Sequence, residues 1–102
     1  ASAAHYTKIA KDEETVMPVI SRFYGIAILM FFEDHQPPHF HAKYEGQLAV
    51  YSVEGCRLLA GKLPPRASRL VKEWTRLHEK ELMEDWHIAQ KEGKLKPIEP
   101  LL

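Results

Sequence analysis

The first part of the chain alternates short apolar runs with turn signals, which is the pattern of an antiparallel sheet. Residues 26–32 form a continuous run of aliphatic and aromatic side chains, and such a run predicts a strand that is covered on both faces. Residues 40–44 then alternate apolar and polar positions, as a half-buried strand does. Residues 48–53 and 56–60 follow, each after a Glu-Gly pair and at a spacing typical of hairpins. We therefore expect a meander of three to four strands.

The later part of the chain changes to helical periodicity. Apolar residues recur three and four apart over residues 67–77, after a Leu-Pro-Pro sequence that favours the start of a helix. A second apolar stripe, over residues 82–89, is rotated by roughly a quarter turn from the first. Because one straight helix would bury both Glu81 and Asp85, we expect either two helices or one helix with a kink near residues 78–80.

Strands and helices are thus segregated along the chain, which is the organisation of an α+β domain. A chain of 102 residues has room for one hydrophobic core. We predict a single domain over residues 17–102, in which the small antiparallel meander packs against the two C-terminal helices or the one kinked helix, with Gly93 as the C-terminal cap. Residues 1–16 carry few large apolar side chains, and Met17 resembles a translation start, so we expect a flexible leader or an artificial extension there.

Charge and cysteine content narrow the function classes. The chain has 14 basic and 14 acidic residues, which excludes a globally basic nucleic-acid binder but leaves room for a local basic face. The single cysteine, Cys56, excludes an intrachain disulfide and fits a reducing compartment. The longest apolar run, residues 26–32, is far shorter than a membrane span, so we expect no membrane association.

The densest candidate chemistry lies in residues 33–41, which read EDHQPPHFH and hold three of the six histidines. Imidazoles and carboxylates are the ligands that zinc and related divalent metals favour, and imidazole also suits acid–base work near neutral pH. In an extended strand His39 and His41 point to the same side, as candidate catalytic residues, while a bend stiffened by two prolines could return His35 to them. The candidate metal ligands are His35, His39, His41 and Asp34.

A purely structural interpretation of the same histidines stays open, because their spacing is not a standard zinc spacing. In that alternative His35 and His39 hydrogen-bond to the main chain of the loop and stiffen the bend, while His41 lies half-exposed on the sheet. Cys56 follows a turn with no visible base nearby, and we expect a packed thiol rather than a nucleophile.

A basic face on the predicted first helix is the second feature. Its side chains lie opposite the apolar stripe and could hold RNA or DNA phosphates by electrostatic attraction. Aromatic residues are not interleaved with this face, so stacking on single strands is not indicated. The alternative is a solvated helix face whose charge is balanced by acidic residues downstream. The four basic residues are Arg66, Arg69, Lys72 and Arg76.

Three blocks of sequence carry a family resemblance: MPVISRFYGI at residues 17–26, DHQPPHFH at residues 34–41 and GKLP at residues 61–64. From Met17 onward the chain resembles a bacterial family known only as a domain of unknown function, numbered four-one-six-zero. The resemblance implies a small cytoplasmic bacterial protein and marks the histidine block as a family signature, but it supplies no activity and no catalytic residues. Relatives look like members of two-gene cassettes of the toxin–antitoxin kind, which implies a partner protein encoded by a neighbouring gene.

Three classes of function therefore stay open, in this order. The first is an accessory or interaction module, with a partner from a neighbouring gene or a second copy of the chain. The second is a metal- or histidine-dependent nuclease or other phosphoester hydrolase that uses the histidine cluster, with Arg22 or Lys43 neutralising phosphate charge. The third is nucleic-acid binding through the basic face. Enzymatic activity is left undecided, and the only cofactor under consideration is a divalent metal such as zinc.

Overall fold

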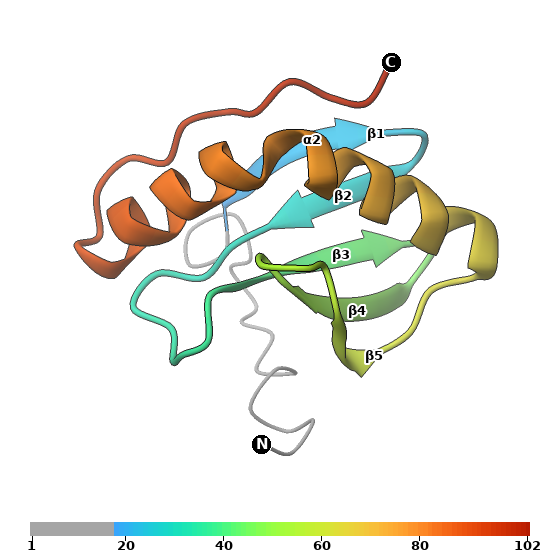
Figure 1. Ribbon diagram of the computed structural model, residues 1–102, viewed down its shortest axis with the longest axis horizontal. Helices are drawn as coiled ribbons and strands as arrows, with labels where there is room; N and C mark the ends of the chain where they lie inside the picture. The colour runs from blue at the N-terminus through green and yellow to red at the C-terminus, as the bar shows by residue number, and fades with distance from the viewer. Residues whose placement is uncertain (1–17) are drawn as a thin grey trace.

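The computed structural model describes residues 18–102 of the chain. An antiparallel five-stranded sheet with the order β1-β2-β3-β4-β5 lies under one long helix, α2, which crosses one of its faces (Figure 1). Each strand pairs with the next one along the chain, as short hairpin connections require. The elements are β1 (Val19–Phe23), β2 (Ile26–Leu29), β3 (His39–Tyr44), β4 (Gln47–Ser52), β5 (Leu58–Gly61) and α2 (Pro65–Gln90).

The α+β class is confirmed, but the meander has five strands and not three to four. The missed strand is β1, whose apolar positions are interrupted by Ser21 and Arg22. The feature that marks β1 is the turn that follows it. Tyr24 and Gly25 both have positive φ angles, 51° and 81°, as a tight two-residue hairpin turn requires. The predicted leader at residues 1–16 lies outside the described residues.

Helix α2 is a single helix with a kink, which confirms the second of the two predicted forms. The kink falls at His78, whose φ of −125° and ψ of 23° are not helical. Asp85 is buried nonetheless, and its Oδ1 accepts a hydrogen bond of 2.9 Å from the main-chain N–H of Lys96. Glu81 is exposed, and its Oε1 lies 2.5 Å from Nδ1 of His78. Among the described residues, no helix combines the length and the apolar character that crossing a membrane requires.

The end of α2 differs in detail from the prediction. The C-cap residue is Lys91, and the left-handed residue that follows is Glu92, with a φ of 54°. Gly93 comes one position later, and its N–H donates to the carbonyl of Ile88 over 3.0 Å. The chain then runs back along the helix to β1 (Figure 1), where the N–H of Ile98 donates to the carbonyl of Ile20 over 2.8 Å.

The core lies between α2 and the sheet and is centred on two tryptophans. The ring centre of Trp74 lies 5.2 Å from that of Phe23 on β1 and 6.1 Å from that of Phe40 on β3, so Trp74 packs the helix against both of these strands. Trp86, in the part of α2 beyond the kink, is almost fully buried, and its ring centre lies 5.2 Å from that of His39. Because successive residues of a strand point to opposite faces, Leu29 belongs to a second, smaller apolar cluster.

The buried carboxyl of Asp85 yields a stability prediction. Burial raises its pKa, and the main-chain N–H and the charge of Lys96 oppose that rise only in part. The folded state therefore binds this proton more tightly than the unfolded chain does, so the contribution of Asp85 to stability falls as pH rises through the raised pKa. We expect Asp85→Asn, which keeps an acceptor for Lys96, to raise the free energy of unfolding at neutral pH.

Urea denaturation at neutral pH and at about pH 3 measures this difference, which should vanish at the lower pH because both states are then protonated. An exposed carboxyl on the same helix that is not among the charges acting on Asp85 supplies the control, and Glu73→Gln should change little at either pH. A lower stability of Asp85→Asn at neutral pH would contradict the prediction.

Candidate functional site

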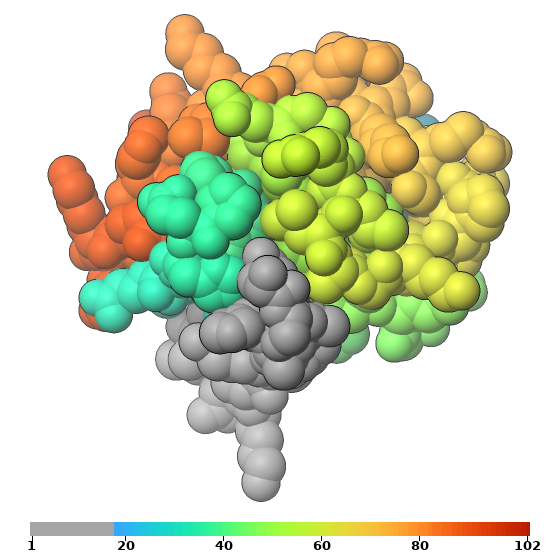
Figure 2. Space-filling view, turned by 60° about the horizontal axis from the view of Figure 1, so that its bottom comes forward, coloured from blue at the N-terminus to red at the C-terminus, as the bar shows by residue number. Residues whose placement is uncertain are grey.

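The histidine block lies in the connection between β2 and β3 and at the start of β3. This bend, residues 30–38, includes a cis peptide bond between Gln36 and Pro37. Its two ends are attached to different elements: the N–H of Glu33 donates to the carbonyl of Ala89 near the end of α2, and the carbonyl of Pro38 accepts from the N–H of Val53 after β4. Figure 2 shows the bend at the surface between the C-terminal part of α2 and the β4–β5 turn.

Asp34 and His39 form the buried centre of the site. Oδ2 of Asp34 lies 2.9 Å from Nε2 of His39, and the two side chains are 3% and 1% exposed. Nδ1 of His39 lies 2.7 Å from the carbonyl oxygen of Pro37. Both ring nitrogens of His39 thus face oxygen atoms that accept hydrogen bonds. As hydrogen bonds, the two contacts require one proton on Nδ1 and a second proton shared between Nε2 and the carboxylate, and a metal ion could take the place of that second proton.

Asp34 is held in its ionised form. Burial acts to raise its pKa, but the hydrogen bond with His39, the main-chain N–H of His35 and the electrostatic interaction with both imidazoles together lower the pKa below its ordinary value. The N–H of His35 donates to Oδ1 over 2.8 Å. A buried carboxylate of this kind requires a positive group beside it.

His35 completes the cluster from the solvent side. Its side chain is 34% exposed, and its Nε2 lies 3.6 Å from Oδ1 of Asp34. Nδ1 of His35 donates to the carbonyl of Gln36 over 3.0 Å, since a carbonyl oxygen can only accept. The rings of His35 and His39 are 5.2 Å apart. The ligand atoms of Asp34, His35 and His39 all lie within 4.8 Å of one another, which is close enough to hold a metal ion.

The orientation of the two imidazoles favours ligation through the same ring atom. In His35 and in His39 alike, Nδ1 is directed at a main-chain carbonyl and Nε2 at the carboxylate. Metal-binding histidines commonly donate their second ring N–H in this way, because the hydrogen bond sets the ring orientation and keeps the ligating nitrogen unprotonated. Three protein ligands leave a coordination position of zinc open to water.

His41 lies outside this group of ligand atoms. As predicted, it is on the same side of β3 as His39, and the two ring centres are 5.7 Å apart. Its ring meets the edge of Phe31 at 4.8 Å, and it is fully buried, so the half-exposed position of the structural alternative is wrong. The same alternative predicted that His35 and His39 hydrogen-bond to the main chain of the loop, and this part is correct, because each ring contacts a loop carbonyl.

The predicted phosphate-neutralising residues lie away from the cluster. Arg22 pairs with Ala27 across β1 and β2, and Ala27 pairs with Lys43 across β2 and β3, so both side chains lie in one row of the sheet. Lys43 is four positions beyond His39 on β3, which corresponds to roughly 13 Å along a strand. Arg66, Arg69, Lys72 and Arg76 are exposed on α2, and Lys72 and Arg76 line a cavity together with Arg57.

The fold and this site define an α+β domain with a buried carboxylate between two imidazoles at a bend of its sheet. A family model described as a domain of unknown function, DUF4160, matches residues 25–87. The chain belongs to this family, as the resemblance predicted, and the matched range includes the whole bend and most of α2. No curated protein and no solved structure matches the chain.

The central contact yields a second stability prediction. Asp34→Ala removes the carboxylate that faces the buried Nε2 of His39, and we expect the free energy of unfolding to fall by about 2 kcal/mol in the presence of a chelator. Asp34→Asn, which keeps an acceptor oxygen without the charge, should lose less. Urea denaturation measures both, with the exposed substitution Glu54→Ala as the control. Equal stabilities of Asp34→Ala and the wild type would show that the contact contributes nothing to the fold.

Proposed function

We propose that this protein is a metal-binding domain that holds a divalent transition metal, zinc first, through Asp34, His35 and His39. The observation that carries this proposal is the convergence of one carboxylate and two Nε2 atoms within 4.8 Å of one another. Imidazole nitrogens and a carboxylate oxygen form a donor set that suits zinc and its neighbours rather than magnesium or calcium.

The distances within the cluster are compatible with a metal ion as well as with a hydrogen bond. Zinc binds nitrogen and oxygen at about 2.0–2.2 Å, so two ligands of a tetrahedral ion lie roughly 3.3 Å apart. The two contacts of the carboxylate with the imidazoles, 2.9 Å and 3.6 Å, lie on either side of that value. A bound cation would also balance the charge of Asp34, which is ionised although its side chain is buried.

A zinc ion held by these three residues would have a coordination position left for water, and this suggests the class of reaction to test. A zinc ion at this site would lower the pKa of a bound water molecule, and the partly exposed His35 leaves this side of the site near solvent. Metal-assisted hydrolysis is the activity that we therefore propose to test first, with phosphoesters as the substrate class. His39, the candidate catalytic residue that belongs to the cluster, would act as a metal ligand. The partner protein and the bacterial, cytoplasmic setting that the resemblance implies stay predictions.

Zinc binding tests the site directly. We expect the chelator-treated protein to bind one zinc ion per chain, with a rise in melting temperature that excess chelator reverses. His35→Ala should weaken zinc binding by about tenfold or more, since the loss of an outer partner alone commonly has an effect of that size. Calorimetric titration and metal analysis measure affinity and stoichiometry.

His35 is suited to this test because its side chain is partly exposed, so the variant should fold as the wild type does. His87→Ala is the matched control, since His87 is exposed on α2 and lies outside the cluster. Zinc affinity that is lost equally in both variants, or in neither, would refute the assignment of the site.

The hydrolytic activity has its own test. The zinc-loaded protein should release nitrophenol from bis(p-nitrophenyl) phosphate, and His35→Ala should reduce the rate at a zinc concentration that saturates the wild type. His87→Ala should retain the full rate. A protein that binds zinc at this site but hydrolyses nothing would be a metal-binding domain without the proposed reaction.

A further inference from the structure

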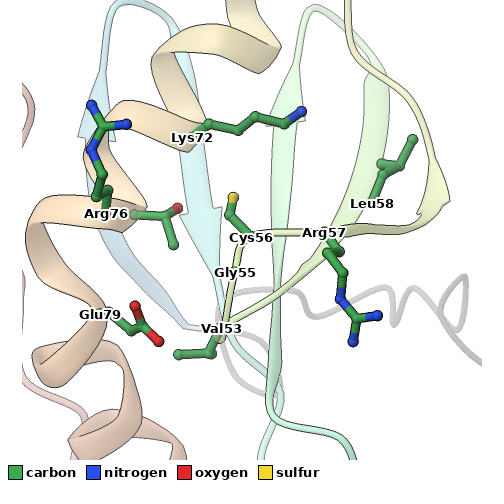
Figure 3. Close-up of a pocket in the computed structure, with 9 residues that line it drawn as sticks. Val53, Gly55, Cys56, Arg57, Leu58, Lys72, Arg76 and Glu79 are labelled. Carbon is green, nitrogen blue, oxygen red and sulfur yellow. The ribbon is translucent and has the colours of Figure 1, made fainter.

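A cavity lies between the β4–β5 turn and the first half of α2. Its volume is about 520 Å³, within the range of small-molecule pockets. One wall is formed by residues 53–58 of the turn and the start of β5, and the other by one face of the helix between Lys72 and Glu79 (Figure 3). No ligand of the proposed metal site contributes to this cavity.

The turn that forms the first wall is held in place by Ser52. Its Oγ donates to the carbonyl of Glu54 over 2.6 Å and accepts from the N–H of Arg57 over 2.9 Å. The N–H of Ser52 also donates to the carbonyl of Arg57. Gly55 and Cys56 both take positive φ angles, 71° and 47°, which turn the chain back toward the helix. This wall is therefore pre-formed rather than a loose loop.

The wall of the cavity that α2 forms carries cationic side chains, because the helical repeat places them on one face. Lys72, Thr75, Arg76 and Glu79 are spaced by three, four and seven positions and therefore share one face of α2. With Arg57 from the opposite wall, the lining carries three cationic side chains and one carboxylate, that of Glu79. Figure 3 shows Lys72 reaching from the helix across the pocket toward the strand side. The pocket thus has a net positive charge.

The remaining lining is apolar and chemically inert. Leu58 is 51% exposed at the rim, and Val53 and Cys56 are buried beneath it. Burial raises the pKa of the Cys56 thiol, with Thr75 and Lys72 opposing that rise only in part, so the thiol stays neutral. Cys56 is therefore a wall of the pocket and not a nucleophile.

We propose that this pocket binds a free mononucleotide, with the phosphate held by the cationic lining and the base against the apolar lining that includes Leu58. A lone inorganic phosphate would fill only part of the volume and would leave the apolar wall uncovered. The Glu79 carboxylate accepts hydrogen bonds only, which suits the hydroxyl or amino groups of a nucleoside. An extended nucleic acid would instead need the whole basic face of α2, including Arg66 and Arg69, which lie outside the pocket.

Titration of the full chain with nucleoside 5′-monophosphates, the matching nucleosides and inorganic phosphate tests the proposal. Heteronuclear NMR should show shifts at residues 53–58 and 72–79, with the monophosphates binding more tightly than either fragment. Lys72→Glu and Arg76→Glu should each weaken monophosphate binding by about tenfold or more. The side chains of Lys72 and Arg76 are exposed, so both variants should fold, and circular dichroism checks that they do.

Arg66→Glu and Arg69→Glu are the matched controls, because they make the same charge change on the same helix outside the pocket. Both should retain the affinity of the wild type for monophosphates. Two results would overturn the proposal: a lack of saturable binding of any monophosphate, or binding that Arg66→Glu weakens as much as Arg76→Glu does. The second result, joined with tight binding of single-stranded RNA, would indicate an extended polyanion surface instead.

Discussion

The contact between the Asp34 carboxylate and the His39 imidazole determines the chemistry of the bend between β2 and β3. Both side chains are buried, and both nitrogens of the imidazole face acceptor oxygens. A buried carboxylate in such a place is stable only beside a positive charge, whether that charge is carried by protons on the ring or by a metal ion. The position of His35, and with it the third ligand atom of the cluster, follows from this contact through the main-chain hydrogen bond to Oδ1.

The attachments of the bend explain why this arrangement is rigid enough to serve as a site. One end is bonded to the last turns of α2 through Ala89, and the other to the residue after β4 through Val53. The ring of His39 also contacts Trp86, so the kinked helix packs directly against the buried centre of the candidate site. The kink lies at His78, and the helix beyond it buries Asp85 as well as Trp86.

Local patterns along the chain predict much of the fold. The change of apolar phase between residues 77 and 82 predicted the kink, and the Glu-Gly pairs predicted the turns on either side of β4. Strand β1 escaped prediction because Ser21 and Arg22 break its apolar pattern, and its pairing with β2 depends on a turn with left-handed Tyr24. The end of α2 was predicted at Gly93 for a similar reason, since the left-handed residue after the C-cap Lys91 is Glu92 and not a glycine.

The candidate site was predictable only as a set of residues. Strand alternation placed His39 and His41 on one side, but it could not show that His41 meets Phe31 while His35 turns toward Asp34. Orientation of ring nitrogens depends on which carbonyls the bend presents, and no sequence pattern encodes that. The cavity could not be predicted from the sequence for another reason. Arg57 and Arg76 are far apart in the chain, and only the placement of α2 over the β4–β5 turn brings them to one pocket.

The most direct measurement is ¹⁵N NMR of the histidine rings before and after one equivalent of zinc is added to the chelator-treated protein. The account predicts that Nε2 of His35 and Nε2 of His39 both move to the shifts of metal-bound nitrogen, while both Nδ1 atoms stay protonated and the ring of His87 is unchanged. Ring signals of His35 and His39 that do not respond to zinc, or a response of His41 in their place, would contradict it.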